Sequence, residues 1–153
     1  MVKSKLLPLD KILSQLDKSD RIAIVACNNC ARVCGVGGKE NAEKMEEILD
    51  KEGYNVVSVC DVIAACNAYY YDDANISPAA NTILVLSCPS GIRLVKRLFT
   101  DKKVITTTEI EGGIIASPTL GRYKVVEVFT GKEALKGKEY KIYTDVELKD
   151  TKL

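Results

Sequence analysis

The sequence predicts an α/β fold: a small doubly wound, Rossmann- or flavodoxin-like parallel sheet followed by an antiparallel pair of strands. Three observations support this prediction. Apolar runs alternate with amphipathic helical segments over residues 21–109, as in a parallel sheet whose strands are joined by crossover helices. The run at residues 21–27 is continuously apolar rather than alternating, which is typical of a strand buried on both faces. Residues 123–148 instead contain two β-branched and aromatic runs separated by a glycine-containing connector.

The individual elements follow from the spacing of the apolar residues. Predicted helices occupy residues 8–18, 39–53 and 91–99, where apolar side chains recur at helical spacing. Predicted strands of the parallel sheet occupy residues 21–27, 55–60, 82–88 and 103–109. The segment 66–78 is too polar for a helix, and its second half is loop-like.

Length and composition limit the classes of protein to consider. The 153 residues suffice for one domain with a hydrophobic core. We expect a single metal-binding domain over residues 1–153, with a cysteine-bearing core at 21–113 and the strand pair at 123–148. A formal net charge of +1 gives no electrostatic reason to bind nucleic acid or a membrane. The first 20 residues lack the apolar run of a signal peptide or anchor, so the sequence predicts a cytoplasmic protein.

The cysteines carry the clearest functional signal. The chain has six cysteines and no histidine, which in a reducing compartment indicates metal or redox chemistry rather than disulfides. Cys27, Cys30 and Cys34 form a C-x2-C-x3-C series where the first buried strand ends, and Cys60 and Cys88 end the next two predicted strands. Parallel strands end at one edge of their sheet and lie about 4.8 Å apart. We therefore expect these five thiols to face one volume.

Thiolates in this arrangement suit an iron–sulfur cluster. A [4Fe–4S] cluster takes four thiolates, typically from a tight loop and one distant cysteine. The loop would supply Cys27, Cys30 and Cys34, and the fourth ligand would be Cys88 or Cys60. Zinc is the alternative metal, because it also binds four thiolates, and it would make the protein a structural module for partner docking.

Three other interpretations stay open. A free cysteine is often simply a buried apolar side chain. That interpretation is unfavourable in the glycine-rich loop, whereas for Cys66 it is as plausible as a functional role. Cys27 and Cys30 also match a dithiol C-x-x-C motif, although that leaves the other cysteines without a role. A cluster with one open iron could act as an enzyme, with the polar segment 69–73 as a lid. We find no nucleophile-and-base arrangement that would support independent hydrolytic chemistry.

Glycines and a serine flank the predicted ligands. The stretch VCGVGGKE matches neither the phosphate-loop nor the dinucleotide-binding pattern, so phosphate binding is disfavoured. We expect instead that backbone amides in the turn and at helix starts donate hydrogen bonds to cluster sulfurs. The residues predicted to contact the cofactor in this way are Gly35, Gly37, Gly38, Ser90 and Gly91.

Several of these pieces occur in the order found in a known family. They are CNNCARVCGVGGKENAEKMEEIL, the later Cys60, NTILVLSCPSGIRLV and KKVITTTEIEGG, within residues 21–113. Together they resemble the N-terminal cysteine-rich part of the small subunit of acetogen-type methylenetetrahydrofolate reductase, related to the methylenetetrahydrofolate reductase C-terminal-like family. The resemblance implies an iron–sulfur or zinc-bearing accessory subunit that docks on a flavin-containing reductase, or serves another redox protein, in one-carbon metabolism. That family continues into a second, ferredoxin-like cysteine-rich region, whereas residues 123–148 of this chain contain no cysteine.

Overall fold

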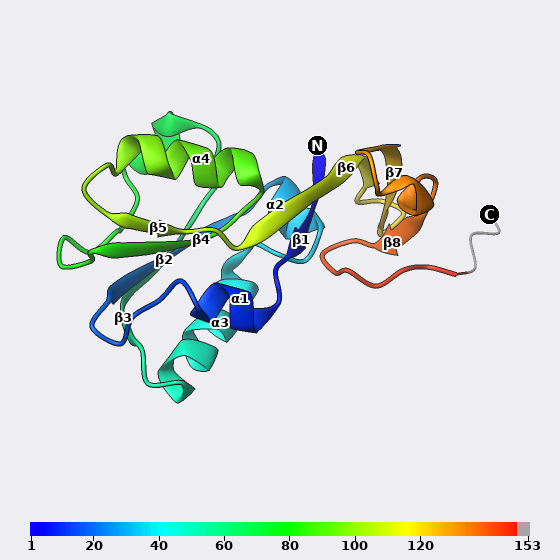
Figure 1. Cartoon of the computed structure of the whole chain (residues 1–153). Coiled ribbons are helices and arrows are strands. Elements are labelled where there is room, and N and C mark those ends of the chain that lie inside the picture. Colours follow the sequence, from blue (N-terminus) through cyan, green and yellow to red (C-terminus); the bar gives the residue numbers. More distant parts are fainter. Residues whose placement is uncertain (150–153) are drawn as a thin grey trace.

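The computed structural model describes residues 1–149 and folds them around two four-stranded sheets (Figure 1). The parallel sheet has the order β3-β2-β4-β5 and consists of β2 (Arg21–Cys27), β3 (Asn55–Val62), β4 (Thr82–Leu86) and β5 (Lys103–Ile105). The antiparallel sheet has the order β1-β6-β7-β8 and consists of β1 (Val2–Leu6), β6 (Thr108–Ser117), β7 (Arg122–Val128) and β8 (Glu139–Lys141). The predicted mixed α/β fold with a parallel sheet is confirmed.

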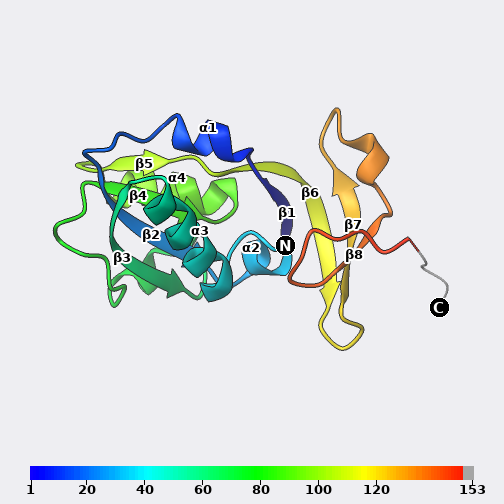
Figure 2. The ribbon, with the colours of Figure 1, turned by 90° about the horizontal axis from the view of Figure 1, so that it is seen from below.

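Helices cover both faces of the parallel sheet (Figures 1 and 2). The helix α4 (Pro89–Leu98) lies on one face, and α1 (Leu9–Leu13) and α3 (Lys39–Lys51) lie on the other. One apolar cluster joins Ile22 and Ile24 of β2 to α1 and α3, and a second joins Val25 of β2 to α4. Successive side chains of a strand point to opposite faces, so the continuously apolar β2 supplies both layers.

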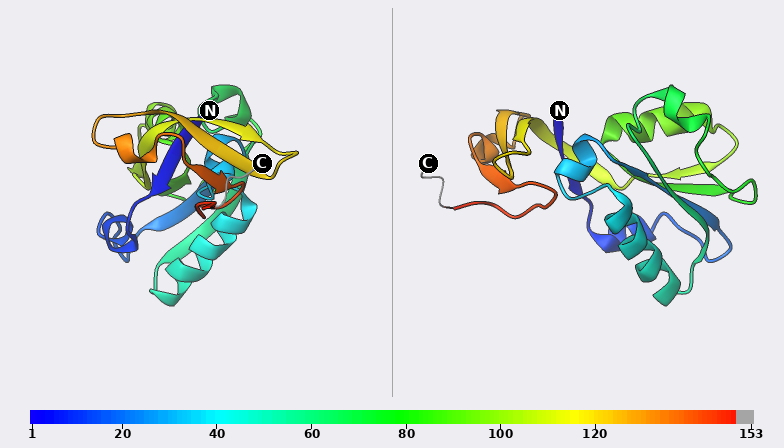
Figure 3. Two further views of the ribbon diagram at one scale, coloured as in Figure 1. Left: turned by 90° about the vertical axis from the view of Figure 1, so that its right-hand side faces the viewer. Right: turned by 180° about the vertical axis from the view of Figure 1, so that it is seen from behind.

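Short helices lie outside these layers. They are α2 (Cys30–Val33), η1 (Ala68–Tyr71) and η2 (Glu133–Leu135). The first of them, α2, contacts β2 and also β1 of the antiparallel sheet, so it lies where the two sheets meet (Figure 3). None of the helices within residues 1–149 is long and apolar enough to cross a membrane.

Two adjacent chain segments connect the sheets, one after β1 and one after β5. The Leu7 amide donates to the Thr107 carbonyl at 2.8 Å, and the Thr108 hydroxyl donates to the Ser87 carbonyl at 2.6 Å. The run 103–109, predicted as one strand, is therefore divided: β5 pairs with β4, and β6 starts at Thr108 and pairs with β1. Composition does not reveal this division, because the run consists largely of β-branched residues.

Other elements differ from the prediction at their ends. The α-helix expected over residues 8–18 covers only Leu9–Leu13, and the strand expected at 55–60 continues to Val62, so Cys60 lies inside a strand rather than at its end. The strand β4 stops at Leu86, and Cys88 is the N-cap of α4. The expected C-terminal pair is confirmed as β7 and β8, which are antiparallel. Sequence reasoning missed β1, which pairs with β6.

Two adjacent glycines in β6 provide a test of this sheet. A Cβ on Gly112 would overlap the carbonyl oxygen of Glu127 in the paired strand, whereas a Cβ on Gly113 would meet the Glu127 side chain at an ordinary 3.6 Å. We expect Gly112→Ala to lower the free energy of unfolding by about 2 kcal/mol, because the paired backbone cannot move aside. Gly113→Ala should lower it by less than about 1 kcal/mol. Urea unfolding followed by circular dichroism measures both, and equal losses would contradict the close approach of β6 and β7.

Candidate metal-thiolate site

Three cysteines from two segments meet at the carboxyl edge of the parallel sheet. Cys27 is the last residue of β2, Cys30 is the first of α2, and Cys88 precedes α4. The thiols of Cys30 and Cys88 are neighbours that strongly affect each other's pKa, and Cys27 lies near enough to interact electrostatically with both. These three are among the five thiols predicted to face one volume.

The loop after β2 returns to the end of that strand. The Asn28 amide donates to the Val62 carbonyl of β3 at 2.9 Å, and the Gly38 amide donates to the Cys27 carbonyl at 3.0 Å. A Cβ on Gly37 would overlap the same carbonyl oxygen of Cys27, so this position requires glycine. The loop therefore wraps tightly enough to place Cys30 beside the strand end.

A fourth cysteine joins the group from the segment after β3. The Ala65 amide donates to Cys27 Sγ at 3.4 Å, and the next residue, Cys66, has an exposed side chain and lies within electrostatic range of Cys27. Sequence reasoning left Cys66 as a buried residue or a ligand with equal weight. Its position could have identified it as a candidate, because Cys66 follows the end of β3 at Val62 by only four residues. That strand ends on the edge where Cys27 also emerges.

Three of these thiols differ in how readily they ionise. The neighbouring Cys30 thiol lowers the pKa of Cys88, and the backbone amides at the start of α4 lower it further against the effect of burial. The neighbouring Cys88 thiol and burial raise the pKa of Cys30. Burial also raises the pKa of Cys27, against the lowering effect of the Ala65 and Asn29 amides. Cys88 is thus the thiol that ionises most readily among these three.

The residues predicted to contact a cofactor through their amides divide into two sets. The Gly91 amide donates to the Cys88 carbonyl at 3.0 Å, and the Cys88 side chain makes no capping hydrogen bond at the start of α4. The amides of the loop glycines likewise bind backbone carbonyls instead of sulfurs, at 3.0 Å in each case: Gly35 to Arg32, Gly37 to Ala31 and Gly38 to Cys27. These glycines shape the loop, and Gly35 and Gly38 have positive φ angles of 75° and 86°.

Cys34 and Cys60, the other predicted ligands, lie in different surroundings. Cys34 donates to the Val2 carbonyl at 3.6 Å and packs in the core of the antiparallel sheet with Tyr123 and Tyr140. Burial raises its pKa to about 11. Cys60 is half-buried within β3, where burial and then the nearby Asp61 carboxylate raise its pKa to about 11. Cys60 packs against the apolar cluster that contains Cys27, whereas Cys34 belongs to a separate cluster.

The gathered thiols do not form a finished coordination sphere. Within residues 1–149, no three Cys, Asp or Glu side chains are arranged as a metal-binding group. The donor chemistry nevertheless fits a thiophilic metal or cluster, because several thiols lie near one another at this edge and a backbone amide donates to Cys27 Sγ. No family model, curated protein or solved structure matches the chain.

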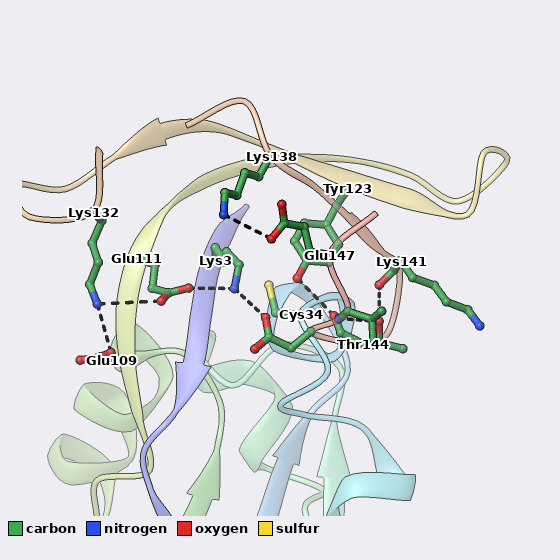
Figure 4. Close-up of polar contacts among 12 residues, drawn as sticks. Lys3, Cys34, Glu109, Glu111, Tyr123, Lys132, Lys138, Lys141, Thr144 and Glu147 are labelled. Carbon is green, nitrogen blue, oxygen red and sulfur yellow. Dashed lines mark hydrogen bonds and ion pairs between the residues drawn. The ribbon is translucent and has the colours of Figure 1, made fainter. Parts of the chain in front are cut away.

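A buried ion-pair network borders the site on the side of Cys34 (Figure 4). Lys3 Nζ lies 2.8 Å from Glu111 Oε2 and 2.9 Å from Asp145 Oδ1, and its side chain is 1% exposed. Burial opposes the charge of Lys3, but the hydrogen bonds to these two carboxylates outweigh it and hold its pKa above the ordinary value. The network ties β1 to β6 and to the segment after β8, and so supports the strand against which α2 packs.

Two neighbouring glutamates test the value of this network. We expect Glu111→Gln to lower the free energy of unfolding by about 3 kcal/mol, because it removes the buried partner of a buried lysine. Glu109 pairs with Lys132 at 3.3 Å but is 48% exposed, so Glu109→Gln should cost less than about 1 kcal/mol. Urea unfolding at neutral pH measures both variants. If Glu111→Gln lowered the free energy of unfolding no more than Glu109→Gln does, the buried pair would add nothing to stability.

Proposed function

We propose that this protein is a cytoplasmic iron–sulfur accessory protein that carries one [4Fe–4S] cluster and transfers electrons to or from a redox partner. Its ligands would be Cys27, Cys30, Cys66 and Cys88. The observation that supports the proposal is that Cys27 lies within electrostatic range of Cys30, Cys66 and Cys88, which belong to three separate chain segments. Relative to the sequence prediction, Cys66 takes the place of Cys34, and Cys88 rather than Cys60 is the distant ligand.

The sheet order supports a site at this position. We infer that the parallel sheet is a doubly wound, Rossmann-like unit, because the order β3-β2-β4-β5 reverses direction between β2 and β4 and helices cover both faces. Ligands of such sheets bind beyond the carboxyl ends of the strands at the point of reversal. Cys27 and Cys30 follow β2 and Cys88 follows β4, so the proposed ligands flank that point.

The surroundings of the thiols suit an electron carrier. When bound, a cluster supplies a one-electron redox step. The chain's own residues donate an amide hydrogen bond to the sulfur of Cys27 and bury the side chains of Cys27 and Cys88. The exposed Cys66 would bring one side of the site to the surface, where a partner can approach. The resemblance to the reductase small subunit makes a flavin-containing reductase the proposed partner, with this chain as a subunit rather than the catalyst.

A structural zinc-thiolate module is the second candidate, and one observation favours it. Cys30 and Cys88 each have the largest effect on the pKa of the other, so the two thiols are neighbours. Sulfurs bound to one zinc at about 2.3 Å lie about 3.8 Å apart, whereas thiolates on different corners of a cluster lie farther apart. In this case the site would hold the sheet edge together for partner docking.

Metal analysis distinguishes the candidates. Protein purified without oxygen should contain about four irons and four acid-labile sulfides per chain and should show broad visible absorption. Single Ser substitutions at Cys27, Cys30, Cys66 and Cys88 should each reduce the metal content. The matched controls Cys34→Ser and Cys60→Ser should retain it.

Two results would contradict the proposal. About one zinc per chain without sulfide would favour the structural module over the electron carrier. Loss of iron in Cys34→Ser with full retention in Cys66→Ser would show that the proposed ligand set is wrong even if a cluster is present.

A further inference from the structure

The turn that leads to Cys66 is held by hydrogen bonds on both sides of Ala65. Ala65 is fully buried. Its amide donates to Cys27 Sγ at 3.4 Å, and its carbonyl accepts a hydrogen bond from the Tyr71 hydroxyl at 2.9 Å. The peptide before Ala65 is therefore directed at a proposed ligand, and the peptide after it is fixed by a tyrosine.

Tyr71 is itself fixed by packing. It ends the 3-10 turn η1, and its ring meets the Phe99 ring edge-on with centroids 6.1 Å apart. Burial raises the pKa of Tyr71 above the ordinary value, so the hydroxyl keeps its proton and acts as the donor to Ala65. The same ring lies within electrostatic range of Cys27, Cys60, Cys66 and Cys88.

The opposite side of Ala65 is closed by the start of α4. A Cβ on Gly91 would lie 2.8 Å from the Ala65 Cβ, so the two backbones approach closely only because this residue is glycine. The Gly91 amide donates to the Cys88 carbonyl at 3.0 Å. Ala65 is thus packed between the start of α4 and the sulfur of Cys27.

We propose that Tyr71 is a positioning residue of the thiol site: by holding the Ala65 carbonyl it aims the Ala65 amide at Cys27 Sγ and keeps Cys66 beside the other thiols. Tyr71 does not touch the metal, and it acts only through Ala65. Where it concerns bound metal, the inference rests on the proposed function. Its structural part concerns the metal-free chain and can be tested alone.

The first measurement is amide hydrogen exchange at Ala65 in the metal-free protein, read by NMR. Tyr71→Phe keeps the ring and its contact with Phe99 but removes the donor. Exchange at Ala65 should become about fivefold faster or more, the amount expected for one lost hydrogen bond. Tyr70→Phe alters the adjacent half-buried tyrosine of the same turn and should leave Ala65 unchanged. Unchanged exchange in Tyr71→Phe would overturn the inference whether or not the protein binds metal.

The second measurement uses Co(II) as a spectroscopic probe, titrated into the metal-free chain under argon. Tyr71→Phe should weaken Co(II) binding, read by the thiolate-to-cobalt charge-transfer band, about fivefold relative to the wild type. Tyr70→Phe should bind as the wild type does. Equal Co(II) affinity in all three proteins would overturn the positioning role. Absence of a charge-transfer band in the wild type would contradict the proposed thiolate site, while the Ala65 exchange result would still decide the role of Tyr71.

Discussion

The burial of β2 on every side is the constraint on which the rest of the structure depends. The strand pairs with β3 on one edge and β4 on the other, and side chains on both of its faces enter apolar clusters. A strand enclosed in this way has one favourable register, because a slip of one residue would move each side chain to the opposite layer. The end of the strand, and with it Cys27, therefore has a fixed place at the sheet edge.

The thiol site follows from what the chain does just beyond that edge. The loop after β2 returns to the Cys27 carbonyl through Gly38 and so brings Cys30 alongside, while Cys88 lies at the start of α4 as its N-cap. The turn through Ala65 closes the group from the β3 side. Each contribution comes from a segment anchored by the parallel sheet, so the arrangement of the thiols depends on the core beneath them rather than on local loop sequence alone.

The parts that the sequence predicted are those set by local pattern. The apolar run of β2 and the helical spacing in α3 and α4 identify the parallel sheet, and the cysteines at or near strand ends identify the edge. The role of Cys34 required tertiary information: helix α2 turns this thiol toward the Val2 carbonyl in a strand that sequence reasoning missed. The role of Cys66 was equally hidden, because nothing near it in the sequence shows that Ala65 contacts Cys27. The division between β5 and β6 depends on pairing with different sheets, which a single β-branched run cannot reveal.

The most direct test of the central claim is X-ray absorption spectroscopy at the edge of the metal that the purified protein carries. We predict a metal surrounded by sulfur alone. Cys66→Ser should replace one sulfur ligand by a lighter atom, and Cys34→Ser should leave the metal's ligands unchanged. An iron spectrum with short iron–iron distances would support the cluster, and a zinc spectrum with four sulfurs at about 2.3 Å would support the structural module. A first shell made mainly of oxygen or nitrogen would contradict the thiolate site itself.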